Sequence, residues 1–196
     1  SAQRIKNVAE LISKRGKNII VLSAMSGTTN TLVEISDYLY KKNTDGAKET
    51  INNLEKHYQD TVDELFSDSN FKDDAVKEIK ACFNYIRSFT KDIFTLFEEK
   101  EILSQGELMS TTMMNLYLQS KGIKSALLPA LEFMRTDKNG EPDSQYIKQK
   151  INAQIDTILN LLFELYMLLS EMNMSRNYQL IVNIVNNTYY NNELFE

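Results

Sequence analysis

The sequence predicts an α/β fold of limited sheet content and abundant helix, because a strand-like run meets a helix-like run across one short bend. Residues 19–22, IIVL, are continuously apolar and mostly β-branched, as in a parallel strand covered on both faces. From Leu32 onward, apolar residues recur at spacings of three and four, which is typical of the buried stripe of a helix. Between these runs, residues 23–30 are small and polar, and Gly27 permits a tight turn.

The composition fits one soluble domain that can bury a core. The chain has 196 residues, a net charge of -5 and no basic cluster, which argues against nucleic acid or an anionic membrane as the main partner. The one cysteine, Cys82, cannot form an internal disulfide and falls in a helical apolar pattern, so we interpret it as a core residue. No secretory leader is recognised ahead of the first helical pattern, and we therefore expect a cytoplasmic protein.

Helical patterns occupy the first hundred residues on both sides of this bend. Residues 1–14 place Ile5, Ala9 and Ile12 on one face, and Gly16 is expected to end that helix. A second helix follows the bend, and residues 47–65 form a third after a polar break. The only histidine, His57, has no second plausible metal ligand near it and is interpreted as an exposed helix residue.

The longest helical pattern extends over residues 71–97. Its apolar stripe includes Val76, Phe83, Ile93 and Phe97, and a second stripe runs beside it at steps of seven. So wide an apolar face needs cover from more than one neighbour, such as the preceding helix or a second subunit. We interpret its aromatic residues as core rather than as a platform for a nucleobase.

The sequence Ser104-Gln105-Gly106-Glu107 precedes another helical pattern and has two interpretations. In the first, Ser104 and Glu107 form a capping box at a helix N-terminus, and Glu107 bonds only to the backbone. In the second, the glycine lets a ligand come close and Glu107 accepts hydrogen bonds from an ammonium group. The pattern alone favours the capping box.

The last third predicts a second strand, a turn and a long helix. Residues 125–128 form the strand, residues 138–142 the turn, and Asp143 caps a helix whose apolar rhythm continues over 147–172. Residues 178–185 are rich in Ile and Val and predict a further strand, and the tail beyond 186 is expected to be loose.

The bend at residues 23–30 is the predicted ligand site. A helix N-terminus presents unpaired N–H groups and a partial positive charge, which suits a carboxylate or a phosphate. In the alternative, Ser26 or Thr28 simply caps the helix. The six glycines are never adjacent, so neither a GxGxxG loop nor a Walker loop can be written.

Three segments in order, VLSAMSGTTNTLVEISDYL, SQGELMSTTMMNLYL and ALLPALEFMRTD, resemble the N-terminal half of the catalytic domain of the aspartokinases, within the amino acid kinase family. The resemblance covers about 1–156, with a helical insertion at about 45–100, and leaves 157–196 as a divergent end. It implies a three-layer αβα arrangement with few parallel strands. It also implies transfer of the γ-phosphate of ATP, with Mg²⁺, to the side-chain carboxylate of L-aspartate, the first step toward lysine, threonine and methionine.

The resemblance also implies roles for individual residues. Ser23 and Thr29 would bind the substrate, and Glu107 would receive its amino group. Supporting roles would fall to Arg135 and to the bend residues Ser26, Gly27 and Thr28. No catalytic residue and no metal ligand is assigned within this chain.

Two features of the aspartokinases have no counterpart here. The sequence shows neither their K-F-G-G-T-S strand with its lysine nor their R-G-G-S-D segment. Because phosphoryl transfer to a carboxylate depends on such positive charges and oriented donors, we expect the chain to bind ATP and Mg²⁺ poorly and to be inactive alone.

Two alternatives remain open. The long apolar helices favour a homo-oligomer, and a non-catalytic helical interaction protein would account for them without an active site. An amino acid kinase with another acceptor is the second alternative.

Overall fold

A computed structural model describes residues 1–14, 19–67, 69–91 and 93–171, without the side chains of residue 69 and of residues 159–171. The chain divides into two compact units, Ser1–Leu127 and Leu128–Glu196, which are described separately. The predicted domain boundaries, 1–156 and 157–196, stay predictions.

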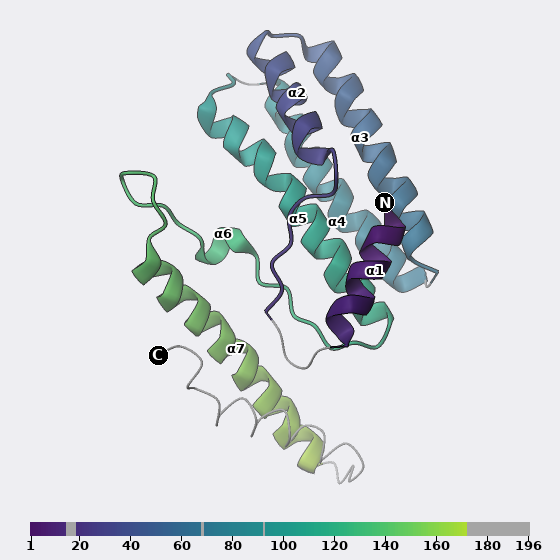
Figure 1. Ribbon diagram of the computed structural model, residues 1–196, viewed down its shortest axis with the longest axis vertical. Coiled ribbons are helices and arrows are strands. Elements are labelled where there is room, and N and C mark those ends of the chain that lie inside the picture. Colours follow the sequence, from purple (N-terminus) through teal and green to yellow (C-terminus); the bar gives the residue numbers. More distant parts are fainter. Residues whose placement is uncertain (15–18, 68, 92, 172–196) are drawn as a thin grey trace. The chain divides into compact units, whose positions relative to one another are not determined.

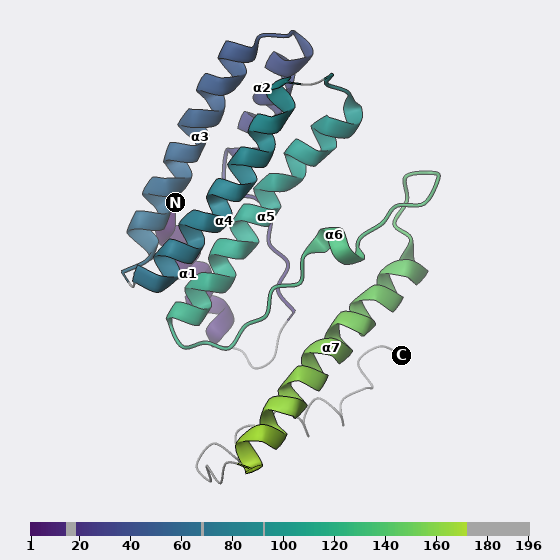
Figure 2. The same ribbon diagram turned by 180° about the vertical axis from the view of Figure 1, so that it is seen from behind.

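The first unit is a bundle of helices (Figure 1). Its elements are α1 (Ala2–Ser13), α2 (Thr28–Tyr40), α3 (Thr44–Leu65), α4 (Ser69–Ser88), a 3₁₀ turn η1 (Phe89–Lys91) and α5 (Leu96–Ser120). Helix α2 packs against α3 and α5, and α4 packs against the same two helices, so these four close a ring. Helix α1 contacts α3 and α5, and Figure 2 shows the bundle from behind.

The core of this bundle consists of the apolar stripes that the sequence predicts. Tyr58 on α3 and Phe83 on α4 are fully buried and make an edge-to-face contact with ring centroids 5.7 Å apart. Fully buried aliphatic and methionine side chains surround them: Leu32, Ile35, Ile51, Ile79, Ile86, Ile102, Met109 and Met113. The lone cysteine, Cys82, is half-buried against this core, and His57 is exposed, as predicted.

The prediction of a three-layer αβα fold is wrong for the part of the chain that the structure describes. That part contains no β-strand, only an isolated bridge between Thr136 and Pro142. Residues 19–22 and 125–128 have no regular secondary structure, and the side chain of Val21 is 91% exposed. Apolar β-branched residues favour an extended backbone, but a strand also needs a hydrogen-bonded neighbour, and the described residues provide none.

The predicted helix at 71–97 is also wrong beyond residue 88. Helix α4 ends at Ser88, and α5 begins at Leu96 after η1 and a short connection. Ile93 and Phe97 are therefore exposed, at 85% and 68%. The sequence pattern did not reveal this break, because the segment between the two helices contains no glycine or proline and the apolar spacing continues across it.

Helix α5 begins eight residues before the Ser104 of the predicted capping box. The real capping box is Thr95 with Glu98, since the Thr95 hydroxyl accepts from the N–H of Phe97 and Glu98 accepts from the N–H of Thr95. Ser104 lies inside the helix and donates to the carbonyl of Glu101. The structure thus excludes the capping interpretation of Glu107.

The second unit contains α6 (Ala130–Phe133), a turn and α7 (Ser144–Glu171), with α6 packed against α7. Gly140 has a φ of 85° in the turn, a conformation that glycine adopts without strain. Asp143 accepts a hydrogen bond from the N–H of Tyr146, which confirms it as the cap of α7. The expected strand at 178–185 and the tail beyond 186 lie outside the described residues.

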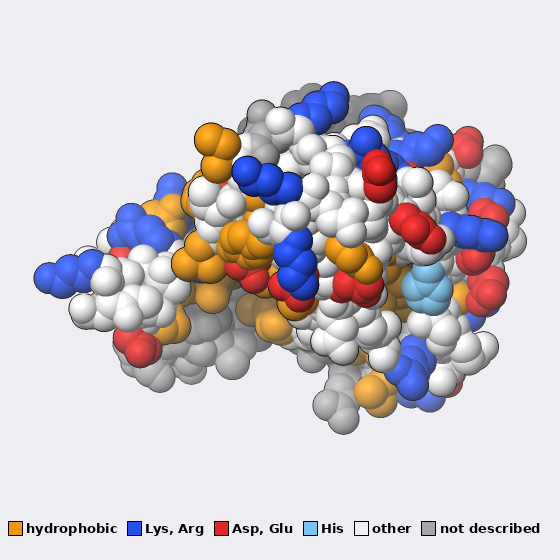
Figure 3. Space-filling model, turned by 90° about the horizontal axis from the view of Figure 1, so that it is seen from above, with side chains coloured by type: hydrophobic (Ala, Val, Ile, Leu, Met, Phe, Trp, Pro, Cys, Tyr) orange, Lys and Arg blue, Asp and Glu red, His pale blue; other side chains and the backbone are white. Residues whose placement is uncertain are grey.

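Figure 3 shows both acidic and basic side chains on the viewed face, with apolar side chains among them. A search of the helices in the described ranges finds none with the length and apolar character needed to span a bilayer.

Candidate functional site

The bend before α2 lies directly against α5 because α5 has a glycine at the point of contact. A Cβ atom on Gly106 would lie 2.9 Å from the Cβ of Ala24 and 3.2 Å from the Cγ2 of Thr28. Only a glycine allows the two backbones this approach without a shift. Gly106 therefore brings the neighbouring Glu107 to the bend.

Two polar side chains of α5 hold the bend in place. Oε1 of Glu107 accepts a hydrogen bond from the N–H of Ala24 at 3.3 Å, and Oγ of Ser110 donates to the carbonyl of Ser23 at 2.8 Å. Glu107 is half-buried, and within the described residues its Oε2 has no hydrogen-bond partner. One carboxylate oxygen thus anchors the bend, while no described residue donates to the other, which can accept from a ligand.

The first turn of α2 begins at Gly27, whose φ is 87°. The N–H of Thr28 donates to Met25 and the N–H of Thr31 donates to Gly27, whereas those of Thr29 and Asn30 have no acceptor in the described part of the chain. Because no side chain caps this helix, the predicted capping role of Ser26 or Thr28 is wrong. The unpaired donors and the helix dipole make this end attractive to an anion.

The hydroxyl groups of the bend differ in their surroundings. Ser23, Ser26 and Thr29 are exposed, and none of their hydroxyls has a partner among the described residues. Thr28, by contrast, is 1% exposed, and its Oγ1 lies 3.0 Å from the hydroxyl of Tyr58. The exposed hydroxyls are accessible to a ligand, whereas the hydroxyl of Thr28 is buried and hydrogen-bonded within the bundle.

Tyr58 lies within the helical pattern that the sequence predicts for residues 47–65, where it is one apolar residue among several. Its burial raises the pKa of the phenol to about 12, and the negative charge of Glu107 contributes in the same direction. A tyrosine among aliphatic residues of a buried stripe indicates a polar contact inside the bundle, because a buried phenol requires a hydrogen-bond partner. The sequence could not identify that partner, which lies 30 residues away.

Arg135 belongs to the second unit. Its Nε donates to Oδ2 of Asp143 at 3.2 Å, and its guanidinium lies 3.9 Å from the ring centroid of Tyr146. Hydrogen bonding from Arg135 holds the pKa of Asp143 below its usual value. The charge of Arg135 is thus already paired with the carboxylate of Asp143 in the same unit.

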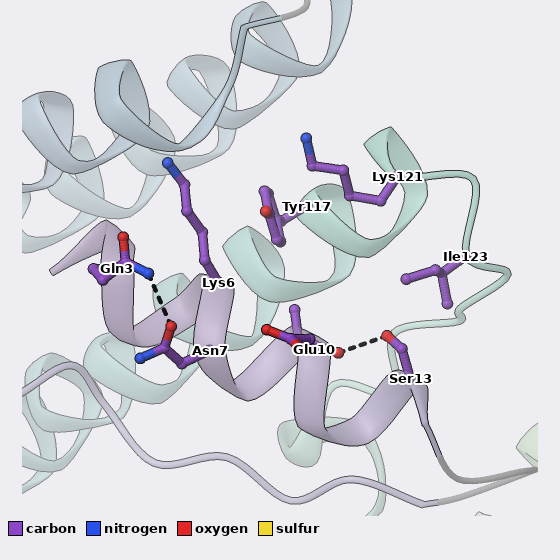
Figure 4. A pocket seen from close by; sticks show the side chains of 9 residues that line it. Gln3, Lys6, Asn7, Glu10, Ser13, Tyr117, Lys121 and Ile123 are labelled. Atoms are coloured by element: carbon purple, nitrogen blue, oxygen red, sulfur yellow. Dashed lines mark hydrogen bonds between the residues drawn. The ribbon is translucent and has the colours of Figure 1, made fainter.

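Two surface hollows formed by described residues of the first unit include no residue of the bend. One, of about 360 Å³, lies between α1 and the C-terminal end of α5 (Figure 4). There the amide of Gln3 donates to Asn7, and the hydroxyl of Ser13 donates to the carbonyl of Ala9. The other, of about 420 Å³, lies along α3 and α4 and is lined mainly by exposed lysine and amide side chains.

The sequence model of the amino acid kinase family matches residues 1–167. This range includes the bend, Glu107 and Arg135. No curated protein matches the chain.

Proposed function

Since this chain belongs to the amino acid kinase family, which implies a phosphotransferase of the kinase type, we propose that its phosphoryl acceptor is the side-chain carboxylate of L-aspartate. One observation carries the proposal: the carboxylate of Glu107 lies beside a helix N-terminus with unpaired N–H groups. A negative group and an anion-binding group side by side match a zwitterionic ligand.

The two ends of L-aspartate would then be recognised by different groups. The free Oε2 of Glu107 accepts from the ligand ammonium, while its Oε1 stays on Ala24. The N–H groups of Thr29 and Asn30, together with the exposed hydroxyls of Ser23 and Thr29, donate to a ligand carboxylate. Ser26 and Gly27 give the bend its shape, and the supporting role expected of Arg135, a residue of the second unit, stays a prediction.

We assign the acceptor part of the reaction to this chain and derive no step through ATP or Mg²⁺. The described residues contain no group of three His, Cys, Asp or Glu side chains that could hold a metal ion. The bend offers hydroxyls and backbone N–H groups, which are not the ligands that Mg²⁺ prefers. The acceptor site is therefore tested through the binding of L-aspartate to this chain.

Substitution of Glu107 by glutamine tests the acceptor site. The change keeps the size and the oxygen that accepts from Ala24, but it removes the charge that pairs with the ammonium group. A charge-assisted hydrogen bond contributes about 1.5–3 kcal/mol, so the affinity for L-aspartate should fall by roughly tenfold to a hundredfold. Isothermal titration calorimetry on the 196-residue chain measures this change.

Glu101→Gln is the matched control, since Glu101 lies on the same helix and its carboxylate accepts from the exposed Tyr85. Its affinity for L-aspartate should equal that of the unchanged chain. Equal affinity of the Glu107→Gln variant, or no binding to the unchanged chain, contradicts the proposal. Tighter binding of L-glutamate or another acidic amino acid would instead identify a different acceptor.

A further inference from the structure

The hydroxyl of Tyr58 is the contact that α3 makes with the polar bend. Tyr58 is 0% exposed, and its hydroxyl lies 3.0 Å from Oγ1 of Thr28, the first residue of α2. The Tyr58 ring makes an edge-to-face contact with Phe83 of α4, which orients it. Thus α3 and α4 together define where the first turn of α2 begins.

This contact complements the one that α5 makes from the other side. Glu107 and Ser110 hold the backbone of Ala24 and Ser23, ahead of Gly27. Tyr58 holds the residue that follows Gly27. The hydrogen bonds from α5 reach only residues ahead of Gly27, whereas Tyr58 makes the side-chain hydrogen bond to the residue that follows it.

We infer that Tyr58 is a positioning residue for the acceptor site: its hydroxyl fixes Thr28, so that the N–H groups of Thr29 and Asn30 face the ligand bound by Glu107. Tyr58 itself does not touch the ligand, because its hydroxyl is buried and engaged with Thr28. The inference rests on the proposed function for the identity of the ligand, but not for the effect on the bend.

The competing explanation is that the pair only satisfies two buried hydroxyls. In that case, removing one hydroxyl leaves the other unpaired and lowers stability, and removing both restores stability. If the pair is purely structural, the double variant should recover ligand affinity together with stability. If the pair positions the bend, the double variant should not recover affinity, because an apolar contact lacks the directionality of a hydrogen bond.

The experiment compares Tyr58→Phe, Thr28→Val and the double variant. Calorimetry measures the affinity for L-aspartate, and amide hydrogen exchange followed by NMR measures the opening of residues 24–31 without ligand. Each of the three variants should bind L-aspartate roughly fivefold more weakly and exchange faster in this segment alone. Thr28→Ser keeps the hydroxyl and should retain the affinity.

Phe66→Leu controls for stability, since it removes buried aromatic area at a ring that contacts Tyr117, not Tyr58, and keeps both hydroxyls. Tyr40→Phe controls for the chemical change at an exposed tyrosine that donates to Glu99. Both controls should keep the affinity and the exchange rates of residues 24–31.

Unchanged exchange in Tyr58→Phe, or recovered affinity in the double variant, overturns the inference. If the unchanged chain binds no L-aspartate, the proposed function fails. Hydrogen exchange still decides whether Tyr58 positions the bend.

Discussion

Tyr58 links stability and binding at the scale of a single residue. Its phenol is kept neutral by burial inside the bundle, with a pKa of about 12 against an ordinary value near 10. The folded chain therefore holds this proton over a pH range in which the unfolded chain has released it. The consequence is a loss of stability on the alkaline side.

We expect the free energy of unfolding to fall between about pH 10 and pH 12, and Tyr58→Phe to flatten that fall. Tyr58 contributes its full stabilisation below about pH 10, and this is lost as the pH rises toward the folded pKa, by about 1–3 kcal/mol. Urea titrations at neutral and alkaline pH measure the difference. The control Tyr40→Phe, at an exposed site, should leave most of the fall in place, and an unchanged slope in Tyr58→Phe would refute the assignment.

Residue patterns pointed to some residues of the candidate site and missed others for definable reasons. The bend and the acid were visible because Gly27 and the Gly106-Glu107 pair stand out in otherwise regular helical patterns. The structure places Glu107 against Ala24. The partnership of Thr28 with Tyr58 was invisible, because it depends on how two helices pack and not on the spacing within either.

At the scale of an element, α5 carries the site because of where it begins. Its start at Leu96 puts Gly106 and Glu107 near the middle of a 25-residue helix, where side chains have fixed directions. A helix that began at Ser104 would leave Glu107 in a first turn, bonded to its own backbone. The location of the N-cap thus decides the role of the acid.

Two alanine substitutions distinguish these starts. Thr95→Ala removes the cap that accepts from Phe97 and should lower the free energy of unfolding by about 1 kcal/mol. Ser104→Ala places a better helix former in a helix interior and should change stability by no more than about 0.5 kcal/mol. Urea unfolding measures both free energies. A larger loss of stability in Ser104→Ala than in Thr95→Ala would indicate that Ser104 is the N-cap.

Helices could be predicted from this sequence more securely than strands. Each helix satisfies its own backbone, so the apolar period at α1 or α3 is enough to define it. A strand depends on a second segment, and residues 19–22 carry the propensity without that partner in the described chain. The α/β expectation failed for this reason.

At the scale of the whole molecule, the connection before α5 leaves apolar surface uncovered. Ile93, Leu96 and Phe97 are 85%, 61% and 68% exposed, within five residues of one another. Neighbouring exposed apolar side chains are typical of contact surfaces. The expected homo-oligomer therefore has a candidate contact at this connection, although the sequence placed these residues in a buried stripe.

We expect the chain to associate with increasing concentration and Phe97→Gln to weaken that association, because the variant removes the aromatic side chain from the exposed surface. Leu11→Gln removes a side chain that is 59% exposed on α1 and is the matched control. Sedimentation velocity over a range of micromolar concentrations measures the association. A monomer at every concentration would contradict the homo-oligomer and also count against a purely structural interaction protein.

The hydrogen bond from Ala24 to Glu107 joins positions 83 residues apart, and the one from Ser110 to Ser23 spans 87. Closing so long a loop costs entropy that only the helices folded between its ends can offset. Refolding should therefore complete the acceptor site last, after α3 and α4 have docked. Under the proposed function, L-aspartate added during refolding would bind only chains whose assembly is finished, and its binding would measure how many chains have reached that state.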